Sequence, residues 1–436
     1  MQRLNSFSNI TTGLLLDVDR QYGSPVYIYD ESTIIQKCKM VLSMPNAYGL
    51  HVRYAMKANS NQTLLRLIEA QGIGIDASSL MEARRAYRAG IAYEKIILTS
   101  QEVQEGNAKE ELEHMMLQGL TYNVCSLRQL EMVAKFAATH KIPLSMRVHP
   151  GVGSGESASR NTGDAYSCFG IHLNDLQSAL DIAKQHGVTI GQVHVHIGSG
   201  ADPAAWRSNI DLELGIVEKY FPDATTVSFG GGLKEARMPE ETAADIEQLG
   251  LYAKEQMEAF YKRTGRKLKM EIEPGTYLMA NAGYILTKVM DKKSTGEQGF
   301  EFLIVNGGME LNTRPLMYGS QHPFYIISQT GQLLSSEFDA QSLKETQAII
   351  VGRCCETGDS QCIDSDGYNA PRPMATPEVG DYVVIGGAGA YCSSMAPFNY
   401  NSHLQAPEIL VRQDGRQQLI RKGQTLEQLL ENEQVI

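Results

Sequence analysis

The chain has 436 residues, 42% hydrophobic and 20% charged, and its 39 basic and 50 acidic residues give a net charge of −11. This composition is typical of a globular protein, and no run approaches the roughly 18 uninterrupted apolar residues of a membrane span. The acidic balance, without a basic stripe, argues against a nucleic-acid partner. Seven scattered cysteines indicate reduced thiols, and residues 1–9 lack a signal-peptide pattern, so we expect a cytoplasmic protein.

Short strand-like runs alternate with helical patterns through the first two thirds of the chain. The eight runs lie at residues 50–56, 74–76, 96–98, 122–124, 144–148, 192–197, 226–229 and 268–272. Stretches with apolar spacing near 3.6, such as residues 63–70 and 127–140, separate them. This alternation predicts a closed (β/α)8 (TIM) barrel, because an open Rossmann sheet would more usually show a G-x-G-x-x-G turn after its first strand.

A second, β-rich region follows the barrel. After about residue 285, strand-like runs are separated by Gly, Pro and Asp turns with little helical period. The alternating run at residues 24–30 is a candidate extra strand of this second sheet. We therefore predict a TIM barrel over residues 36–284 and a C-terminal antiparallel β domain formed by residues 1–35 and 285–436.

Lys57 ends the first strand-like run, at the barrel mouth where catalytic groups gather. Its neighbours Tyr54, Met56 and Ala58 are expected to desolvate it, which would lower its pKa and free the amine as a nucleophile, for instance in Schiff-base chemistry. Taken alone, an exposed lysine just past a strand is the more common arrangement.

Two further strand ends carry candidate groups. Gly230, Gly231 and Gly232 follow the seventh strand, where their backbone N–H groups offer a nest for a phosphate, although a triple glycine also forms ordinary tight turns. Glu273, fixed by a following proline, stands at the tip of the eighth strand. Its carboxylate suits either a protonated ring nitrogen or a strand-end salt bridge.

His194 and His196 project to the same side of the sixth strand. This spacing permits shared zinc ligation, so a barrel metallohydrolase is an alternative function from another class. No matching set of His and Asp stands at the other strand ends, and the glycine-rich exit after His196 suits a flat ligand. The spacing of Cys354, Cys355 and Cys362 is not that of a zinc ribbon either. We predict no metal site.

A strand-end lysine, a phosphate nest, a ring-facing histidine and an anchored carboxylate together match what pyridoxal phosphate requires. The sequence resembles the barrel-type (fold type III) pyridoxal-phosphate decarboxylases, most closely those acting on diaminopimelate. The matches run in order along nearly the whole chain: Tyr54-Ala-Met-Lys57-Ala-Asn, His194-Val-His196-Ile-Gly-Ser199, Phe229-Gly-Gly-Gly, Glu273-Pro-Gly, Gly307-Gly-Met309, Arg314-Pro-Leu-Met-Tyr318, Cys355-Glu356-Thr-Gly-Asp359 and Gly389-Ala-Tyr391. The resemblance implies a barrel, a C-terminal β domain and a homodimer with active sites at the interface.

The resemblance also implies residue roles. Lys57 would bind the cofactor aldehyde, His196 would stack on the ring, and Glu273 would pair with the pyridine nitrogen. Further cofactor contacts would come from Ser199, Gly231, Gly232, Gly275 and Tyr391.

On the substrate side, the resemblance makes Cys355 a proton donor to the carbanion and Glu356 an anchor for the far amine, both reaching into the partner subunit's site. Arg314 and Tyr318 would bind the carboxylate that the product retains. The expected reaction is decarboxylation of meso-diaminopimelate to L-lysine, in lysine biosynthesis.

Two positions depart from the family pattern: Thr276 replaces the usual Arg after Glu-Pro-Gly, and Asn306 replaces the usual Asp before Gly-Gly-Met. Thr276 motivates an alternative substrate, namely D-lysine, D-ornithine or a carboxylated polyamine or siderophore precursor. A non-catalytic regulator on an enzyme scaffold is disfavoured because Lys57 and Cys355 are both present. The Gly- and Ser-rich loop at residues 151–164 is a candidate active-site flap.

Overall fold

The computed structural model describes residues 2–4, 8–154, 161–198, 203–339, 341–342, 346–364 and 366–436. The chain divides into two compact units. We call Lys37–Glu235 with Ala243–Tyr277 the barrel unit, and Met1–Gln36 with Ala236–Thr242 and Leu278–Ile436 the β unit. The segment Ala236–Thr242 thus groups with the β unit, although it lies inside the sequence range assigned to the barrel.

The barrel unit contains a closed cylinder of eight parallel strands. Around the cylinder they are β2 (Leu50–Ala55), β3 (Gly74–Ala77), β4 (Ile96–Thr99), β5 (Thr121–Val124), β6 (Leu144–His149), β8 (Ile190–His194), β9 (Thr226–Ser228) and β10 (Lys269–Ile272). β10 pairs with β2, Met270 opposite Leu50, and this pairing closes the barrel. A short strand, β7 (Ile171–His172), pairs with β6 alone. The predicted (β/α)8 barrel is confirmed.

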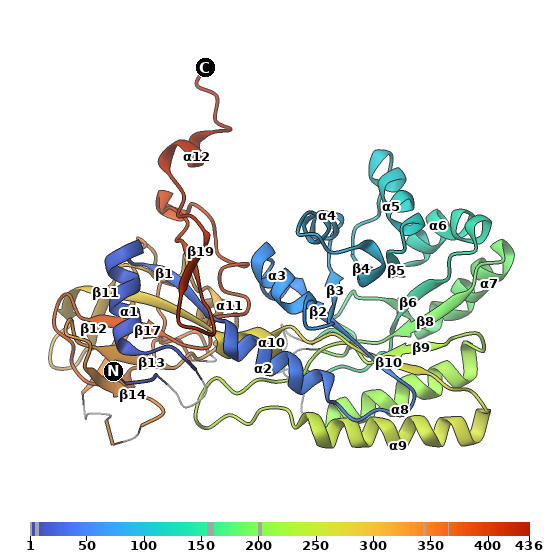
Figure 1. Ribbon diagram of the computed structural model, residues 1–436, viewed down its shortest axis with the longest axis horizontal. Helices are drawn as coiled ribbons and strands as arrows, with labels where there is room; N and C mark the ends of the chain where they lie inside the picture. The colour runs from blue at the N-terminus through green and yellow to red at the C-terminus, as the bar shows by residue number, and fades with distance from the viewer. Residues whose placement is uncertain are drawn as a thin grey trace. The chain divides into compact units, whose positions relative to one another are not determined.

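Helices alternate with these strands and lie outside them (Figure 1). They are α2 (Glu31–Leu42) before β2, then α3 (Gln62–Glu69), α4 (Leu80–Arg88), α5 (Asn107–Leu117), α6 (Leu127–His140), α7 (Leu176–His186), α8 (Pro203–Tyr220) and α9 (Ile246–Thr264). Several begin directly after a strand at a hydroxyl cap: Ser79 accepts a hydrogen bond from the Glu82 N–H, and Ser126 accepts one from the Gln129 N–H. These early caps keep the loops at the strand ends short.

The β unit is a ten-stranded sheet. Its strands are β1 (Val26–Asp30), β11 (Gly283–Ser294), β12 (Glu301–Val305), β13 (Phe324–Ile327), β14 (Leu333–Ser336), β15 (Gln347–Val351), β16 (Arg372–Pro373), β17 (Tyr382–Ile385), β18 (Glu408–Val411) and β19 (Gln417–Arg421). β1 lies between β11 and β18, so the run at residues 24–30 does join this sheet. Most pairs are antiparallel, whereas β1 with β18 and β12 with β15 are parallel. Short helices α1 (Thr12–Tyr22), α11 (Arg314–Tyr318) and α12 (Leu426–Leu430) complete the β unit, and α10 (Thr276–Met279) spans the boundary.

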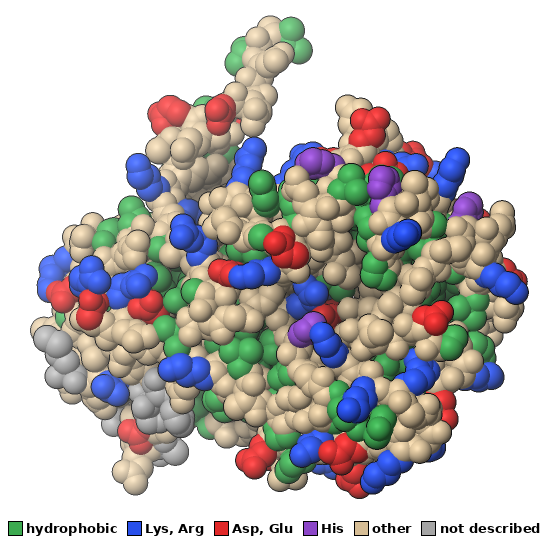
Figure 2. Space-filling view, turned by 45° about the vertical axis from the view of Figure 1, so that its right-hand side comes forward, with side chains coloured by type: hydrophobic (Ala, Val, Ile, Leu, Met, Phe, Trp, Pro, Cys, Tyr) green, Lys and Arg blue, Asp and Glu red, His purple; other side chains and the backbone are tan. Residues whose placement is uncertain are grey.

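No helix in the described part of the chain is long and apolar enough to cross a membrane. Acidic and basic side chains are interspersed over the face shown in Figure 2. All seven cysteines are unpaired thiols.

A buried ion pair crosses the barrel interior. Arg53 on β2 donates through Nε to Oε2 of Glu271 on β10 at 2.7 Å, and Gln192 on β8 donates to Oε1 of the same carboxylate at 2.7 Å. The side chain of Glu271 is 0% exposed and that of Arg53 is 12% exposed. An unpaired charge at this depth is costly, so each partner depends on the other.

We expect Arg53→Met to lower the free energy of unfolding by about 3–5 kcal/mol, because it leaves the Glu271 charge buried without its cation. The double variant Arg53→Met/Glu271→Gln should recover most of this loss, since no buried charge remains. The control is Lys95→Met, which breaks the exposed Lys95–Glu69 pair and should lower the free energy of unfolding far less, because solvent screens this pair. Urea denaturation measures all three, and equal losses for Arg53→Met and Lys95→Met would contradict the prediction.

Candidate functional site

Lys57 lies in a single 3-10 turn, Met56–Ala58, that leaves the end of β2. Met56 and Ala58 are buried, but the Lys57 side chain is exposed. The expectation that its neighbours desolvate this amine is therefore wrong. The physical reason is the turn: with three residues per turn, successive side chains point in different directions, and the buried neighbours do not cover the lysine.

The Lys57 charge nevertheless acts on several groups of the barrel unit. It favours the ionised forms of Asp76, Glu82 and Glu273, and it disfavours protonation of His196. Asp76 and Glu82 end or follow β3, His196 follows β8 and Glu273 follows β10. The barrel therefore gathers these residues at one end.

Glu273 is held by two hydrogen bonds at the tip of β10. His194 Nε2 lies 3.0 Å from its Oε2, and Ser228 Oγ donates to its Oε1 at 3.2 Å. The other ring nitrogen of His194 accepts from the amide of Asn123 at 3.1 Å, so Nε2 carries the proton and donates it to the carboxylate. Asn123 is itself fixed by Ser145 Oγ, which donates to its Oδ1 at 2.9 Å.

This network of hydrogen bonds keeps Glu273 ionised. Burial opposes ionisation, but the electrostatic interaction and hydrogen bond with His194, together with His196 and Lys57, outweigh it and lower the pKa of Glu273 to about 2. Glu273 is therefore a buried carboxylate that stays ionised at neutral pH. Such a group suits a cationic partner such as a protonated pyridine nitrogen.

His196 lies just past the end of β8 and is half-buried. Its Nδ1 accepts a hydrogen bond from the Gly231 N–H at 3.1 Å. Burial lowers the pKa of His196 well below its usual value, and the charges of Arg147 and Lys57 lower it further, so the ring is neutral. A neutral, fixed imidazole is suited to packing against a flat ligand.

The glycine loop after β9 packs tightly against the same histidine. Gly230 has φ +65°, and a side-chain carbon there would lie 2.8 Å from the Val195 carbonyl oxygen and 2.9 Å from His196 Cβ. The Gly231 N–H is already bonded to His196, so any phosphate contact would fall to the rest of the loop, including the partly exposed Gly232. Gly275 is buried directly after Pro274, whose carbonyl accepts the Ala55 N–H at the end of β2.

Two charged residues that sequence reasoning did not single out share this end of the barrel. Asp76, at the end of β3, is buried, and burial with the nearby Glu273 charge raises its pKa well above its usual value. Arg147, on β6, is 8% exposed, and its guanidinium lies 4.9 Å from the centre of the Phe169 ring. Their placement at strand ends was visible in the sequence, but no spacing rule marked them as part of the site.

The β unit gathers a second set of predicted residues. Arg314, at the start of α11, is 4% exposed, and its guanidinium lies 5.6 Å from the Tyr318 ring centre and 5.9 Å from that of Tyr391. Its Nη2 donates to Ser320 Oγ at 3.2 Å, whereas its Nε has no hydrogen-bond partner among the described residues. A buried N–H without a partner is costly, and a charge-assisted hydrogen bond from an anion would remove that cost.

Cys355 and Glu356 lie together in an exposed turn of the β unit. The Cys355 N–H donates to Asn401 Oδ1 at 2.7 Å, and Tyr400 donates its hydroxyl to Glu356 Oε2 at 2.9 Å. The hydrogen bond from Tyr400, with one from the Gly358 N–H, lowers the pKa of Glu356. The turn therefore presents a thiol and a carboxylate to solvent.

This turn is pinned by Asp359, which joins two of the sequence motifs. Its carboxylate accepts the Met309 N–H at 2.6 Å and the Cys354 N–H at 2.7 Å. A side-chain carbon on Gly308 would lie 2.0 Å from Asp359 Oδ1, so a glycine is required there.

Glu310, Cys354 and Asp359 also form a group of possible metal ligands within 4.8 Å of one another. However, the Gly308 N–H and Arg353 Nε bind one oxygen each of Glu310, and both oxygens of Asp359 accept backbone N–H groups. These carboxylates are already satisfied as hydrogen-bond acceptors, which indicates a structural role.

Asn306 also has a structural explanation. Its side-chain amide donates to the Ser24 carbonyl at 3.0 Å, and its Oδ1 accepts the Lys288 N–H at 2.8 Å. An aspartate at this position would lack the donor. The departure at Asn306 therefore affects hydrogen bonds inside the β unit. Thr276, the other departure from the family pattern, is half-buried at the start of α10.

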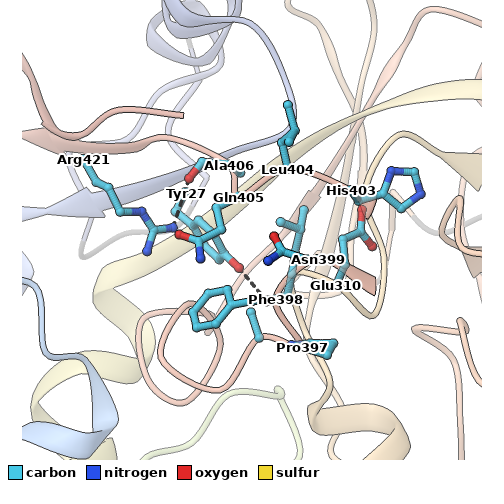
Figure 3. A pocket seen from close by; sticks show the side chains of 12 residues that line it. Tyr27, Glu310, Pro397, Phe398, Asn399, His403, Leu404, Gln405, Ala406 and Arg421 are labelled. Carbon is cyan, nitrogen blue, oxygen red and sulfur yellow. Dashed lines mark hydrogen bonds between the residues drawn. The ribbon is translucent and has the colours of Figure 1, made fainter. Parts of the chain in front are cut away.

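A small pocket of the β unit is shown in Figure 3. Its lining includes Tyr27, Glu310, Phe398, His403 and Arg421. The Tyr27 hydroxyl donates to the Leu311 carbonyl at 2.8 Å, and the Glu310 carboxylate is bonded as described above. None of the predicted cofactor or substrate residues is among those that line it.

Two sequence predictions fall wholly or partly outside the described residues. Ser199 is one of them. The candidate flap at residues 151–164 is the other, since residues 155–160 within it are not described.

Comparisons with known proteins identify the family of the chain. The family model "Pyridoxal-dependent decarboxylase, pyridoxal binding domain" matches residues 31–280. A diaminopimelate decarboxylase of Escherichia coli K12 is 33% identical over 430 residues, which cover 97% of each chain. One of Streptomyces coelicolor is 32% identical over 415 residues, covering 94% of this chain and 89% of that one.

Solved structures give the same result. A crystal structure of diaminopimelate decarboxylase superimposes with a TM-score of 0.88 at 31% identity and covers 99% of each chain. The Helicobacter pylori diaminopimelate decarboxylase, solved in complex with L-lysine, gives a TM-score of 0.76 at 25% identity over 95% of this chain and 98% of that one. The chain therefore belongs to the pyridoxal-dependent decarboxylases, enzymes that use pyridoxal 5'-phosphate to release carbon dioxide from amino acids.

Proposed function

We propose that this enzyme decarboxylates meso-diaminopimelate to L-lysine, as a homodimer in the cytoplasm. The observation that carries the substrate assignment is Arg314, a buried guanidinium with an unpartnered Nε among the described residues, enclosed by two tyrosine rings. Diaminopimelate has a second carboxylate that remains in the product, and a desolvated arginine is the natural group to bind it. The relatives that match nearly the whole chain carry the name of this activity.

The residues of the barrel unit fit the cofactor. When bound, pyridoxal phosphate accepts the electrons of the broken carbon–carbon bond into its ring. Ionised Glu273 would hold a proton on the ring nitrogen, because its pKa of about 2 keeps it negative at every physiological pH. His196 would pack against the ring as a neutral imidazole, and the exposed Lys57 amine would bind the aldehyde carbon. Ser199, Gly232, Gly275 and Tyr391 remain proposed cofactor contacts, and Gly231 would act through its hydrogen bond to His196.

The β unit would supply the substrate-binding and proton-donating groups. Arg314, with Tyr318, would hold the retained carboxylate, and Glu356 would anchor the far amine as an anion stabilised by Tyr400. Cys355 would return a proton to the carbon that loses carbon dioxide. In our proposal Cys355 and Glu356 act in the active site of the partner subunit, which makes the homodimer the active form. All seven cysteines are unpaired, as in a reducing compartment.

The alternatives have less support. A metallohydrolase would need His194 as a ligand, yet one ring nitrogen of His194 bonds Glu273 and the other bonds Asn123. A decarboxylase of D-lysine, D-ornithine or a related precursor is favoured by Thr276 alone. Those two amino acids have a single carboxylate, so they would leave Arg314 unpaired.

Borohydride reduction of the cofactor-loaded enzyme should attach the pyridoxyl group to Lys57, because Lys57 is the exposed amine among the charged groups at the barrel mouth. Peptide mapping by mass spectrometry identifies the modified residue. Lys57→Ala should abolish both the label and carbon dioxide release, whereas the control Lys269→Ala, at the exposed start of β10, should retain both. A label on another lysine would overturn the assignment.

Arg314→Met should reduce kcat/KM for meso-diaminopimelate by about 10- to 150-fold, because it removes a charge-assisted contact to the substrate carboxylate. Carbon dioxide release is measured over a panel that includes D-lysine and D-ornithine, on which this substitution should have little effect. Arg416→Met, at a 78% exposed side chain, is the control. If the wild-type enzyme preferred D-lysine, the substrate assignment would be wrong, but the assignment as a decarboxylase would stand.

Glu273→Gln should destabilise the apoenzyme at neutral pH and lose this effect in acid. Since the pKa of Glu273 falls from 4.5 to about 2 on folding, its ionisation stabilises the folded state fully above pH 4.5. That contribution is lost as the pH falls from 4.5 toward 2. The difference in the free energy of unfolding between wild type and variant should therefore disappear over this range. Urea denaturation across pH measures this difference in the free energy of unfolding, with Glu218→Gln, at an exposed side chain, as the control. A difference that does not change with pH would contradict the lowered pKa of Glu273.

A further inference from the structure

Helix α8 carries an unusual buried face. Trp206, Asn209 and Glu213 follow one another at spacings of three and four residues, so they share one side of the helix. They are 2%, 2% and 0% exposed. Glutamate and asparagine are rarely buried to this extent without specific partners.

The polar atoms of these side chains have no partner among the described residues. They are Trp206 Nε1, both amide atoms of Asn209 and both carboxyl oxygens of Glu213. Gln129 on α6 makes a useful comparison, because it is 1% exposed and bonds the carbonyls of Ser100 and Glu102 and the N–H of Cys125. Five orphan atoms on one helix face are therefore not a general feature of this barrel. Groups of this kind in protein interiors are satisfied by buried water, which typically makes about three hydrogen bonds.

The buried face lies against β9, directly behind the cofactor-binding carboxylate. The Trp206 ring meets Phe229 edge-on, with ring centres 5.9 Å apart. The Ser228 N–H lies near enough to the Glu213 carboxyl to lower its pKa slightly but outside hydrogen-bonding geometry, and the hydroxyl of Ser228 donates to Glu273 at 3.2 Å. A short path thus runs from Glu213 through Ser228 to Glu273.

The ionised form of Glu213 is also disfavoured. Burial raises the pKa of Glu213 well above its usual value, and the negative charges of Glu273 and Glu271 on the neighbouring strand raise it further. Glu271 is paired with Arg53. Glu273 interacts with His194, His196 and Lys57, which favour its ionised form. The groups that shift the pKa of Glu213 include no such cation. A neutral carboxylic acid both donates and accepts, which is what a water site needs from its walls.

We propose that Trp206, Asn209 and Glu213 form an internal water site behind β9, and that Glu213 is a positioning residue that keeps Ser228 in place to bind Glu273. The site would act on the cofactor only through Ser228 and Glu273, and this part rests on the proposed function. Second-layer partners of this kind orient the group that touches the ligand.

The protonation of Glu213 is tested on the apoenzyme. The result of this experiment therefore does not depend on cofactor binding. The infrared difference spectrum between wild type and Glu213→Gln at neutral pH should show the carbonyl stretch of a protonated carboxylic acid. Glu218→Gln, on the exposed face of the same helix, is the matched control and should lack this band. A carboxylate band for Glu213 would overturn the proposal.

The positioning role is tested by the affinity of the apoenzyme for pyridoxal phosphate. Glu213→Leu and Asn209→Leu should each weaken it by about tenfold, while Glu213→Gln should restore most of the affinity because it remains polar and neutral. Glu218→Leu is the control, and thermal unfolding of each apoenzyme checks folding. Wild-type affinity for pyridoxal phosphate in both leucine variants would overturn the proposal. It would also be overturned if Glu213→Gln bound pyridoxal phosphate as weakly as Glu213→Leu. If the wild type itself failed to bind the cofactor, the proposed function would fall, and the infrared band alone would decide the state of Glu213.

Discussion

The site depends on one buried interaction, the hydrogen bond between His194 and Glu273. Burial opposes ionisation of this carboxylate, and His194 contributes most to the stabilisation of the ionised form that suits a pyridine nitrogen. Asn123 and Ser145 hold the histidine in the required tautomer, and Ser228 binds the second oxygen. Strands β5, β6, β8, β9 and β10 thus all contribute to one ionised group, which explains why a closed barrel is needed to build it.

In the proposed function, the two units would supply different parts of the chemistry. The barrel unit supplies rigid strand ends, where His196, Glu273 and the glycine loop are fixed by backbone contacts. The β unit supplies the buried Arg314 and the exposed turn with Cys355 and Glu356. Cofactor contacts in this proposal therefore come largely from strand ends of the barrel unit, and substrate contacts from α11 and the exposed turn of the β unit.

The barrel was predictable because its periodicity is local, and the family motifs are contiguous and lie in order. The β sheet was harder, because the parallel pairing of β1 with β18 joins residues nearly 400 positions apart in sequence, and no local pattern encodes it. The exposure of Lys57 was missed because strand alternation was extended through a 3-10 turn. Glu213 was missed because a glutamate in an amphipathic helix normally faces solvent; only the tertiary contacts reveal that this one does not.

Asp359 has a consequence for how this protein can change. Its carboxylate joins the backbone at Met309 to that at Cys354, and it occupies the space that a side chain at position 308 would need. Two segments some fifty residues apart are therefore constrained together. Mutational libraries built on this scaffold should treat Gly308 and Asp359 as a single unit of variation, since diversifying either one alone would displace the turn that carries the thiol.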